Sequence, residues 1–437
     1  MGNDVPRMMA VRQQFLTSAT LDIRASVESA FHAGIVETFV PGSSIALAVG
    51  SRGITNLRLI VCHLIDQLKR TGCQPFVLPA MGSHGGATTE GQLDLLAGYG
   101  ITERALGVPI RGSMDVELVG RTSDGLEVFF STEALRADGI IAVNRVKPHN
   151  FDGRIGSGIM KMIVVGLGNK RGAQAFHATA SRIGHEASLR SAAEILLRAA
   201  PILGGLAIVE DQLHQTALIE FLPRERMISR EEELLVRAKE LMPSLPFNDI
   251  DLLIVDQMGK NISGVGMDPN VIGRDVQGYS ASLRTQDARN PTIRRIFARD
   301  LTPETHGNAI GIGLADVTTS RLVRSIDYHA TYINALTSLT PQTAKIPMHF
   351  ESDREAIEQV LASLALPVNS QPKVVRISNT LFLENVEISH AYFDLLANKS
   401  TLCPTGQWKR MQFNQAGNLL PLAHRSHPSG GRRIGAT

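Results

Sequence analysis

The 437-residue sequence contains only three cysteines, and none of them belongs to a CxxC pair. Cys62, Cys73 and Cys403 would leave one thiol unpaired, so neither a disulfide framework nor a structural zinc site is expected. Long hydrophobic runs are also missing, because "SSIALAVG" and "MIVVGLG" are far shorter than the roughly 20 residues of a membrane helix. The amino-terminal residues lack the apolar segment of a signal peptide. We therefore expect a cytoplasmic protein without a membrane partner.

An excess of charge of either sign is missing as well. Lysine and arginine total 44 against 42 acidic residues, and 43% of the residues are hydrophobic. This balance is typical of a neutral globular protein, so no nucleic-acid partner is expected. The chain is longer than the roughly 250–300 residues at which single cores stop growing, which favours two domains.

Short β-rich runs alternate with helical patterns from about residue 45 onward. The first strands are expected at residues 45–49, 76–81 and 139–144. The alternation predicts an α/β fold with helices on the faces of the sheets. Two further β-rich runs joined by "SDG" predict a hairpin at residues 115–132, which favours mixed sheets over purely parallel ones.

A linker is expected at "PSLPFND", residues 243–249, between a charged helical segment and a new strand at 250–259. This predicts an N-terminal domain of residues 1–245 and a C-terminal α/β domain of residues 246–437. The polar, glycine-rich end of the chain from about residue 424 is expected to be mobile.

Several common catalytic motifs are missing. In "VVGLGNKRG", residues 164–172, the glycine spacing is GxGxxxG, and no acidic residue ends a second strand about 20 positions later, so a dinucleotide-binding turn is a poor match. The sequence also has no P-loop, no HExxH helix and no GxSxG nucleophile elbow.

Two histidines each follow an expected strand. His84 lies in the glycine-rich loop "GSHGGAT", and His149 ends the segment "NRVKPH", which also contains Arg145 and Lys147. Ligands of open α/β sheets gather at the carboxyl ends of the strands, and two nearby cations suit a phosphate or carboxylate. The alternatives are a solvated turn for His84 and a solvated rim for the two cations.

Lys161 lies in "SGIMKMIVVG" between large apolar residues. Burial without a partner would lower the pKa of its amine and make it a nucleophile toward a carbonyl or thiocarboxyl carbon. Alternatively, the amine reaches water along a buried stem. Downstream, His177 lies in a helical pattern, and a metal held mainly by a cofactor would need only one such imidazole.

Polar residues also follow strands in two other places. Gln257 and Lys260 lie in "DQMGK" after the strand in the second half, and Arg52 follows the strand at residues 45–49. Lys260 and Arg52 are two cations on matching loops that can bind one carboxylate from opposite domains. Each of them taken alone is more typical of a surface cation.

Taken together, "GSHGGAT", "NRVKPH", "SGIMK" with the downstream His177, and "DQMGK" resemble the nickel-dependent lactate racemase family. The resemblance spans most of the chain and is strongest over residues 45–180 and 256–274. It implies two α/β domains, a nickel-pincer nucleotide bound in the cleft between them, and racemisation or epimerisation of a 2-hydroxy acid. The chain departs from the family pattern at Val49, where founding members place an aspartate.

The resemblance also implies roles for individual residues. His84 and His149 match the paired acid/base histidines, Lys161 matches the lysine that can hold the cofactor through a thioamide, and His177 matches the nickel ligand. Trp408, the only tryptophan, matches an aromatic residue of the cleft. The resemblance further implies that the cofactor is bound by Arg145, Lys147 and Ser157. It implies that the substrate is bound by Arg52, Gln257 and Lys260.

The implied mechanism is a hydride transfer, because the Cα–H of a 2-hydroxy acid is too weak an acid for simple proton abstraction. One histidine takes the hydroxyl proton while hydride moves to the nickel-pincer nucleotide, and its return to the other face of a transient 2-oxo acid inverts the centre. Two alternatives stay open. One is an NAD-dependent 2-hydroxy acid dehydrogenase, which needs the dinucleotide-binding turn that this sequence matches poorly. The other is a non-catalytic nickel- or nucleotide-binding protein.

Overall fold

A computed structural model of the chain describes residues 5–15, 17–35, 39–50, 53–149, 153–276, 291–367 and 369–422. The chain divides into two compact units, which we call the N-terminal unit, residues 16–243, and the C-terminal unit, residues 244–437 together with 1–15. Among the described residues, no helix is both long and apolar enough to cross a membrane. The tail that the sequence predicts to be mobile lies outside the described residues.

The N-terminal unit contains a five-stranded sheet in the order β3-β2-β6-β7-β8. Its strands are β2 (Ser44–Val49), β3 (Gln74–Pro79), β6 (Gly139–Arg145), β7 (Ile202–Glu210) and β8 (Thr216–Pro223). The pairs are parallel except for β7 with β8. The predicted hairpin, β4 (Val116–Arg121) and β5 (Glu127–Ser131), forms a separate two-stranded sheet. The predicted mixed α/β class is confirmed, and β8 is the antiparallel strand of the main sheet.

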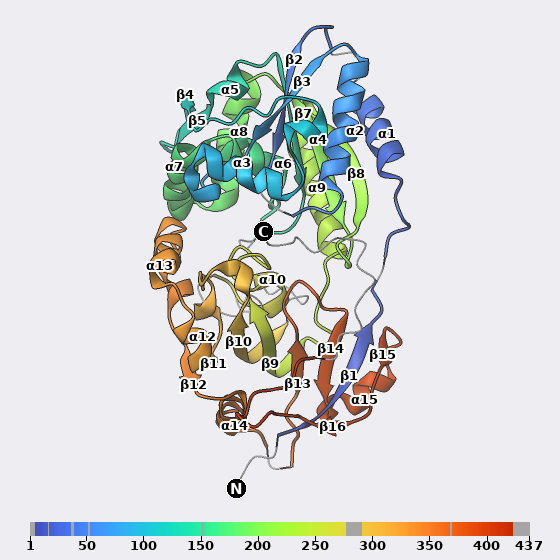
Figure 1. Ribbon diagram of the computed structural model, residues 1–437, viewed down its shortest axis with the longest axis vertical. Coiled ribbons are helices and arrows are strands. Elements are labelled where there is room, and N and C mark those ends of the chain that lie inside the picture. Colours follow the sequence, from blue (N-terminus) through green and yellow to red (C-terminus); the bar gives the residue numbers. More distant parts are fainter. Residues whose placement is uncertain are drawn as a thin grey trace. The chain divides into compact units, whose positions relative to one another are not determined.

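Helices cover both faces of this sheet (Figure 1). They are α1 (Ile23–Ile35), α2 (Leu57–Arg70), α3 (Thr89–Gly98), α4 (Glu103–Leu106), α5 (Thr132–Leu135), α6 (Ile159–Lys161), α7 (Asn169–Ile183), α8 (His185–Ala199) and α9 (Met227–Glu240). Alternate strand residues enter two cores: Ile45 and Leu47 of β2 pack with α1 and α2, whereas Ala46 and Ala48 join the core of α6 to α9. Because both faces are covered, these strands are apolar throughout.

The C-terminal unit contains a nine-stranded sheet with the main order β12-β11-β10-β9-β13-β14-β1-β15, and β16 pairs with β1. Its strands are β1 (Arg7–Gln13), β9 (Asp249–Met258), β10 (Thr292–Leu301), β11 (Val317–Thr319), β12 (Met348–Phe350), β13 (Val374–Ile377), β14 (Asn385–Ser389), β15 (Leu402–Pro404) and β16 (Lys409–Arg410). The pairs from β12 to β13 are parallel, and those of β14, β1, β15 and β16 are antiparallel.

The first strand of the chain lies in this second sheet. The sequence predicts one domain over residues 1–245, whereas β1 pairs with β14 and β15 of the C-terminal unit (Figure 1). The reason is burial, because Met9 and Val11 of β1 complete the apolar core of the C-terminal unit. The helices of this unit are α10 (Pro269–Ile272), α12 (Ser320–Arg324), α13 (Tyr328–Thr337), α14 (Asp353–Ser363) and α15 (Phe393–Ala397).

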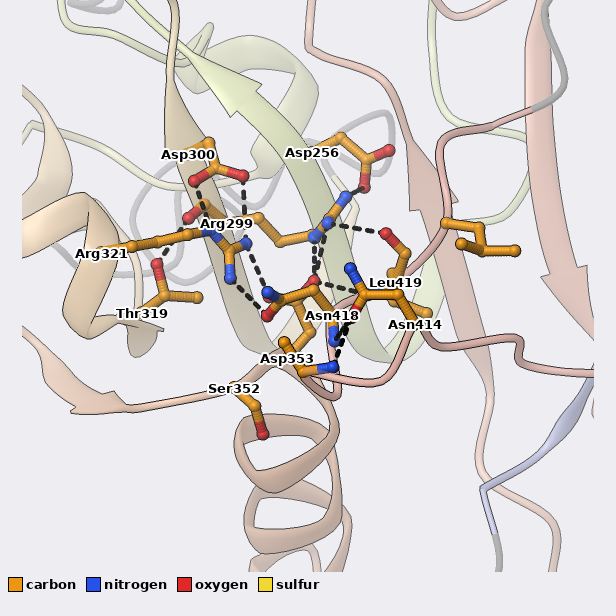
Figure 2. Close-up of polar contacts among 12 residues, drawn as sticks. Asp256, Arg299, Asp300, Thr319, Arg321, Ser352, Asp353, Asn414, Asn418 and Leu419 are labelled. Atoms are coloured by element: carbon orange, nitrogen blue, oxygen red, sulfur yellow. Dashed lines mark hydrogen bonds and ion pairs between the residues drawn. The ribbon is translucent and has the colours of Figure 1, made fainter.

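A buried ionic network fixes the carboxyl ends of β9 and β10 (Figure 2). Asp353, the first residue of α14, is fully buried and pairs with Arg299 at 2.6 Å and Arg321 at 2.7 Å. Arg299 also pairs with Asp256 of β9 at 2.8 Å. Asp353 accepts a further hydrogen bond from the backbone N–H of Leu419. The network therefore joins two strand ends, the helices α12 and α14, and a segment near the end of the described chain.

Candidate functional site

Four side chains of the N-terminal unit form a cluster that we call the histidine–lysine cluster: His149, Lys161, His177 and His185. Lys161 Nζ and His149 Nε2 are hydrogen-bonded. The rings of His149 and His185 stack with centroids 4.5 Å apart, and His185 and Phe176 form a T-shaped pair with centroids 5.2 Å apart. His177 lies close enough for the charge of Lys161 to act on it. The cluster therefore combines three imidazoles and one amine.

The loop that carries His149 is closed at its base by backbone pairing. Lys147 and Ser157 exchange two N–H···O bonds of 2.8 Å each, which form an isolated antiparallel bridge. The loop begins two residues after the end of β6, so the carboxyl edge of the sheet presents His149. This position is the one that the strand-end pattern predicts.

Lys161 ends the three-residue helix α6 and precedes a π-helical turn, Met162–Gly166. Every residue of that turn is buried, as is Met160 on the other side, whereas Lys161 itself is half-buried. The π turn is uncommon and occurs frequently at functional sites. The apolar residues on both sides of Lys161 thus enclose its stem while the amine meets His149.

Burial is the main electrostatic influence on the three imidazoles. Desolvation, together with the charges of Lys161 and its neighbours, lowers the pKa of His149 well below its usual value. The same two causes lower the pKa of His177 to about 4, and they lower that of His185 to about 3. All three rings are therefore neutral near pH 7, which is the form that accepts a proton or binds a metal.

The loop that carries His84 rests against the π turn. The N–H of Gly82 donates to the carbonyl of Gly166 at 3.0 Å, and Gln92 Nε2 of α3 donates to the carbonyl of Gly82 at 3.0 Å. Gly85 has φ +64, and a Cβ there would overlap the backbone of Gly91. Gly82 and Gly85 thus let this loop pack closely against its neighbours, and His84 is half-buried within it.

Arg145 lies at the end of β6, where the sequence predicts a cofactor-binding cation. Its guanidinium forms an ion pair with Glu210 of β7, and both side chains are largely buried, at 16% and 5% exposed. Glu210 also accepts the N–H of Thr55 at 2.9 Å. Arg145 therefore joins two strand ends and a loop. Lys147 contributes its charge toward His149, which is one of the causes of the lowered pKa of that ring.

The predicted substrate-binding residues lie at the end of β9. Gln257 is exposed, and its N–H donates to the carbonyl of Ser378 at 2.8 Å. Lys260 Nζ donates to Asn334 Oδ1 of α13 at 3.1 Å. These residues belong to the C-terminal unit, whereas the histidine–lysine cluster belongs to the N-terminal unit. Arg52, the third predicted residue, lies outside the described residues.

Trp408 does not lie at the strand end that carries Gln257. Its ring meets His390, which directly follows β14, with centroids 4.8 Å apart. β13 runs parallel to β9, and β14 runs antiparallel to both. His390, just after the end of β14, therefore lies level with the beginning of β9, whereas Gln257 lies near the end of β9. Trp408 therefore lies toward the opposite end of β9 from Gln257, and its match to an aromatic residue of the cleft stays a prediction.

His185 is the member of the cluster that the sequence analysis misses. It is the first residue of α8, and the buried residues of that helix recur at His185, Ser188, Leu189 and Ala192. This spacing is that of the core-facing stripe of a helix. A histidine in such a stripe predicts burial, and the signal was present in the sequence.

Comparisons with known proteins bear on the part of the chain that holds the cluster. Residues 17–189 match the family model for the lactate racemase N-terminal domain. The predicted resemblance to the lactate racemase family is confirmed. The lactate racemase match includes the His84 loop and all four cluster residues. No curated protein matches the sequence.

Solved structures extend the likeness in fold. The lactate racemase apoprotein from Thermoanaerobacterium thermosaccharolyticum superposes with a TM-score of 0.51 at 14% identity, covering 85% of this chain and 94% of that one. A protein from Thermotoga maritima has a TM-score of 0.48 at 12% identity, covering 75% of this chain and 84% of that one. The first similarity supports a shared fold with lactate racemase.

The described residues contain no group of three or more histidine, cysteine, aspartate or glutamate side chains that is placed to hold a metal ion. The donors in the histidine–lysine cluster are neutral imidazoles and an amine. Such a set suits a metal whose other ligands come from a bound cofactor.

Proposed function

We propose that the chain is a racemase or epimerase of a 2-hydroxy acid and uses a nickel-pincer nucleotide. The observation that carries the proposal is the cluster of neutral imidazoles around Lys161, which lies wholly within the residues that match the lactate racemase N-terminal domain. The wider fold similarity to a lactate racemase apoprotein supports the same reaction class.

The donor set fits the proposed cofactor. Metal binding requires a neutral imidazole, and burial lowers the pKa of His177 to about 4, so this ring is available at neutral pH. Lys161 would hold the nucleotide, and Lys147 and Ser157 are further proposed contacts. Arg145 is also a proposed contact, and its ion pair with Glu210 would fix the direction of its guanidinium. When bound, the nucleotide would supply a hydride acceptor and donor, a chemistry that side chains do not provide.

His149 and His84 are the proposed acid/base pair. The pKa of His149 is lowered by burial and by Lys161, so its ring is neutral and can take the hydroxyl proton of the substrate. Two bases are needed because the two enantiomers present their hydroxyl groups to different sides. Gln257, Lys260 and Arg52 would bind the carboxylate, which holds the reacting carbon in place while the proton moves.

The test uses the full chain produced together with the enzymes that make the cofactor. Nickel content and intact mass measure loading, and chiral chromatography measures interconversion of single enantiomers across a panel of 2-hydroxy acids. His149→Asn and His84→Asn should each lower the rate by about 10²–10⁴-fold while nickel and cofactor stay bound. His329→Gln, an exposed histidine on α13, is the matched control and should leave the rate unchanged.

Other outcomes assign the chain to the competing classes. Oxidation of the hydroxy acid with stoichiometric formation of reduced NAD would identify a dehydrogenase. Bound nickel and nucleotide with no change of stereochemistry across the panel would identify a carrier. Full activity in either histidine variant would remove that histidine from the mechanism.

A further inference from the structure

Glu231 is a buried carboxyl next to the peptide that carries Lys161. It lies on α9, and its side chain is 0% exposed. The other buried residues of this helix are Met227, Leu234, Leu235 and Ala238, so the helical period places Glu231 on the apolar face. Burial raises the pKa of Glu231 to about 7, and the backbone N–H groups of Met160 and Ile159 oppose that change. Within the described chain, Glu231 Oε1 has no hydrogen-bond partner.

The Glu231 carboxyl and the Asn144 amide hold the peptide before Lys161 from two sides. Glu231 Oε2 accepts the N–H of Met160 at 2.8 Å. Asn144 Nδ2, at the end of β6, donates to the carbonyl of Gly158 at 2.9 Å. A Cβ on Gly158 would overlap Glu231 Oε1, although the backbone of Gly158 is extended at φ −160. The space taken by the carboxyl, and not the backbone conformation, therefore requires glycine here.

The hydrogen bonds from Glu231 and Asn144 matter because α6 has only three residues. A helix of that length has no stability of its own, so its orientation depends on contacts from outside. Lys161 is its last residue, and the Lys161 amine is hydrogen-bonded to His149. Whatever fixes residues 158–160 therefore also fixes the direction of the Lys161 side chain.

We propose that Glu231 is a positioning residue for Lys161, which it orients toward His149 by holding the backbone of residues 158–160. The proposal rests on the function proposed for Lys161. The cost of burying a carboxyl without a cation argues that the group is retained for such a task.

The experiment measures the reactivity of the amine in the full chain purified without cofactor. Trace acetic anhydride labels lysines in competition between about pH 6.5 and 10.5, and peptide mass spectrometry gives the ratio of Lys161 to the exposed Lys170. In Glu231→Ala this ratio should move toward one by about fivefold, the equivalent of one net hydrogen bond, and its profile across this pH range should change accordingly. Glu231→Gln keeps an acceptor oxygen and should stay within about twofold of the unaltered chain.

Two further variants separate positioning from general destabilisation. Glu240→Ala removes an exposed carboxyl from the same helix and should leave the ratio unchanged. Gly158→Ala should displace the Glu231 carboxyl and reproduce the effect of Glu231→Ala, and adding it to Glu231→Ala should change nothing more. Gly158→Ala also provides the test if Glu231→Ala does not fold.

Two results would overturn the proposal. One is a folded Glu231→Ala with the same Lys161 ratio and pH profile as the unaltered chain. The other is additive effects of Gly158→Ala and Glu231→Ala. The labelling needs no cofactor, so it also tests a chain that binds no nickel-pincer nucleotide. In such a chain, the expected change in the labelling ratio would support the positioning of Lys161, and the missing nucleotide would overturn only the proposed function.

Discussion

The imidazole ring of His185 lies against that of His149, with centroids 4.5 Å apart and 18° between the ring planes. His149 is thereby held on one side by Lys161 and on another by a second ring. His185 in turn packs against Phe176 with the two ring planes nearly perpendicular. The proposed acid/base residue is therefore oriented by packing as well as by its hydrogen bond.

His185→Ala should slow substrate interconversion about two- to tenfold, because an aromatic pair contributes about 0.5–1.5 kcal/mol and its loss frees the His149 ring to rotate. His185→Phe keeps a ring at this position and should retain most of the rate. The measurement is the turnover of loaded enzyme by chiral chromatography. Equal losses in the two variants would show that the imidazole nitrogens of His185, and not stacking, support His149.

The stability of the cofactor-free chain should depend on the histidine–lysine cluster between about pH 6.5 and 4.5. The pKa values of His149, His177 and His185 are lowered by burial and by Lys161, so below pH 6.5 the unfolded chain binds protons that the folded chain does not. Each histidine then lowers the free energy of unfolding by about 1.4 kcal/mol per pH unit. Glu231 acts in the opposite direction, because burial raises its pKa to about 7 and the folded chain binds the proton. Three histidines against one glutamate predict a net loss of about 2–3 kcal/mol per pH unit as the pH falls.

Denaturant melts across this pH range measure the slope. His185→Phe should reduce it by about 1.4 kcal/mol per pH unit, and Glu231→Gln should increase it by a similar amount. His329→Gln, on the exposed surface of α13, is the control. A slope that His185→Phe leaves unchanged would show that this ring does not resist protonation in the folded chain.

Local patterns in the sequence predicted much of the fold and part of the cluster. The apolar runs of β2, β3 and β6 are those of strands covered on both faces, and such runs are visible without any knowledge of the partner strands. His149 and Lys161 stood out because each breaks a local pattern, the first after a strand and the second within an apolar run. They are the two residues that the structure joins by a hydrogen bond.

Features that depend on distant partners were not predictable in the same way. The sequence predicts an anionic ligand for Arg145, and no local pattern indicates its ion pair with Glu210, 65 residues later in the sequence. The pairing of β1 with β14 and β15 joins opposite ends of the chain. Glu231 lies in a charged helical segment, and "REEELL" alone does not separate its buried glutamate from the next two, which are partly or fully exposed. Only its register with the apolar stripe of α9 distinguishes it.

Arg145 and Glu210 are predicted to be structural partners. Arg145→Met or Glu210→Gln should each lower the free energy of unfolding by about 3–5 kcal/mol, because each leaves a largely buried charge without its partner. The double variant should recover a substantial part of that loss, as measured in denaturant melts. Arg121→Met breaks the exposed pair with Glu127 and should cost less than about 1 kcal/mol. Weaker cofactor binding without any loss of stability in Arg145→Met would instead support the cation role that the sequence suggested.

Asp353 is predicted to be the most sensitive carboxylate of the network in Figure 2. It is fully buried between Arg299 and Arg321, so Asp353→Ala would leave two arginines facing each other without the charge that they share. The expected loss is about 3–5 kcal/mol in the free energy of unfolding, measured in urea with tryptophan fluorescence. Trp408 is a suitable probe because it packs against the core of this unit. Glu351, two residues before the start of α14, forms an exposed pair with Arg324. Glu351→Ala is therefore the matched control and should cost less than about 1 kcal/mol. Similar losses in the two variants would mean that the buried arginines regain solvent when Asp353 is removed.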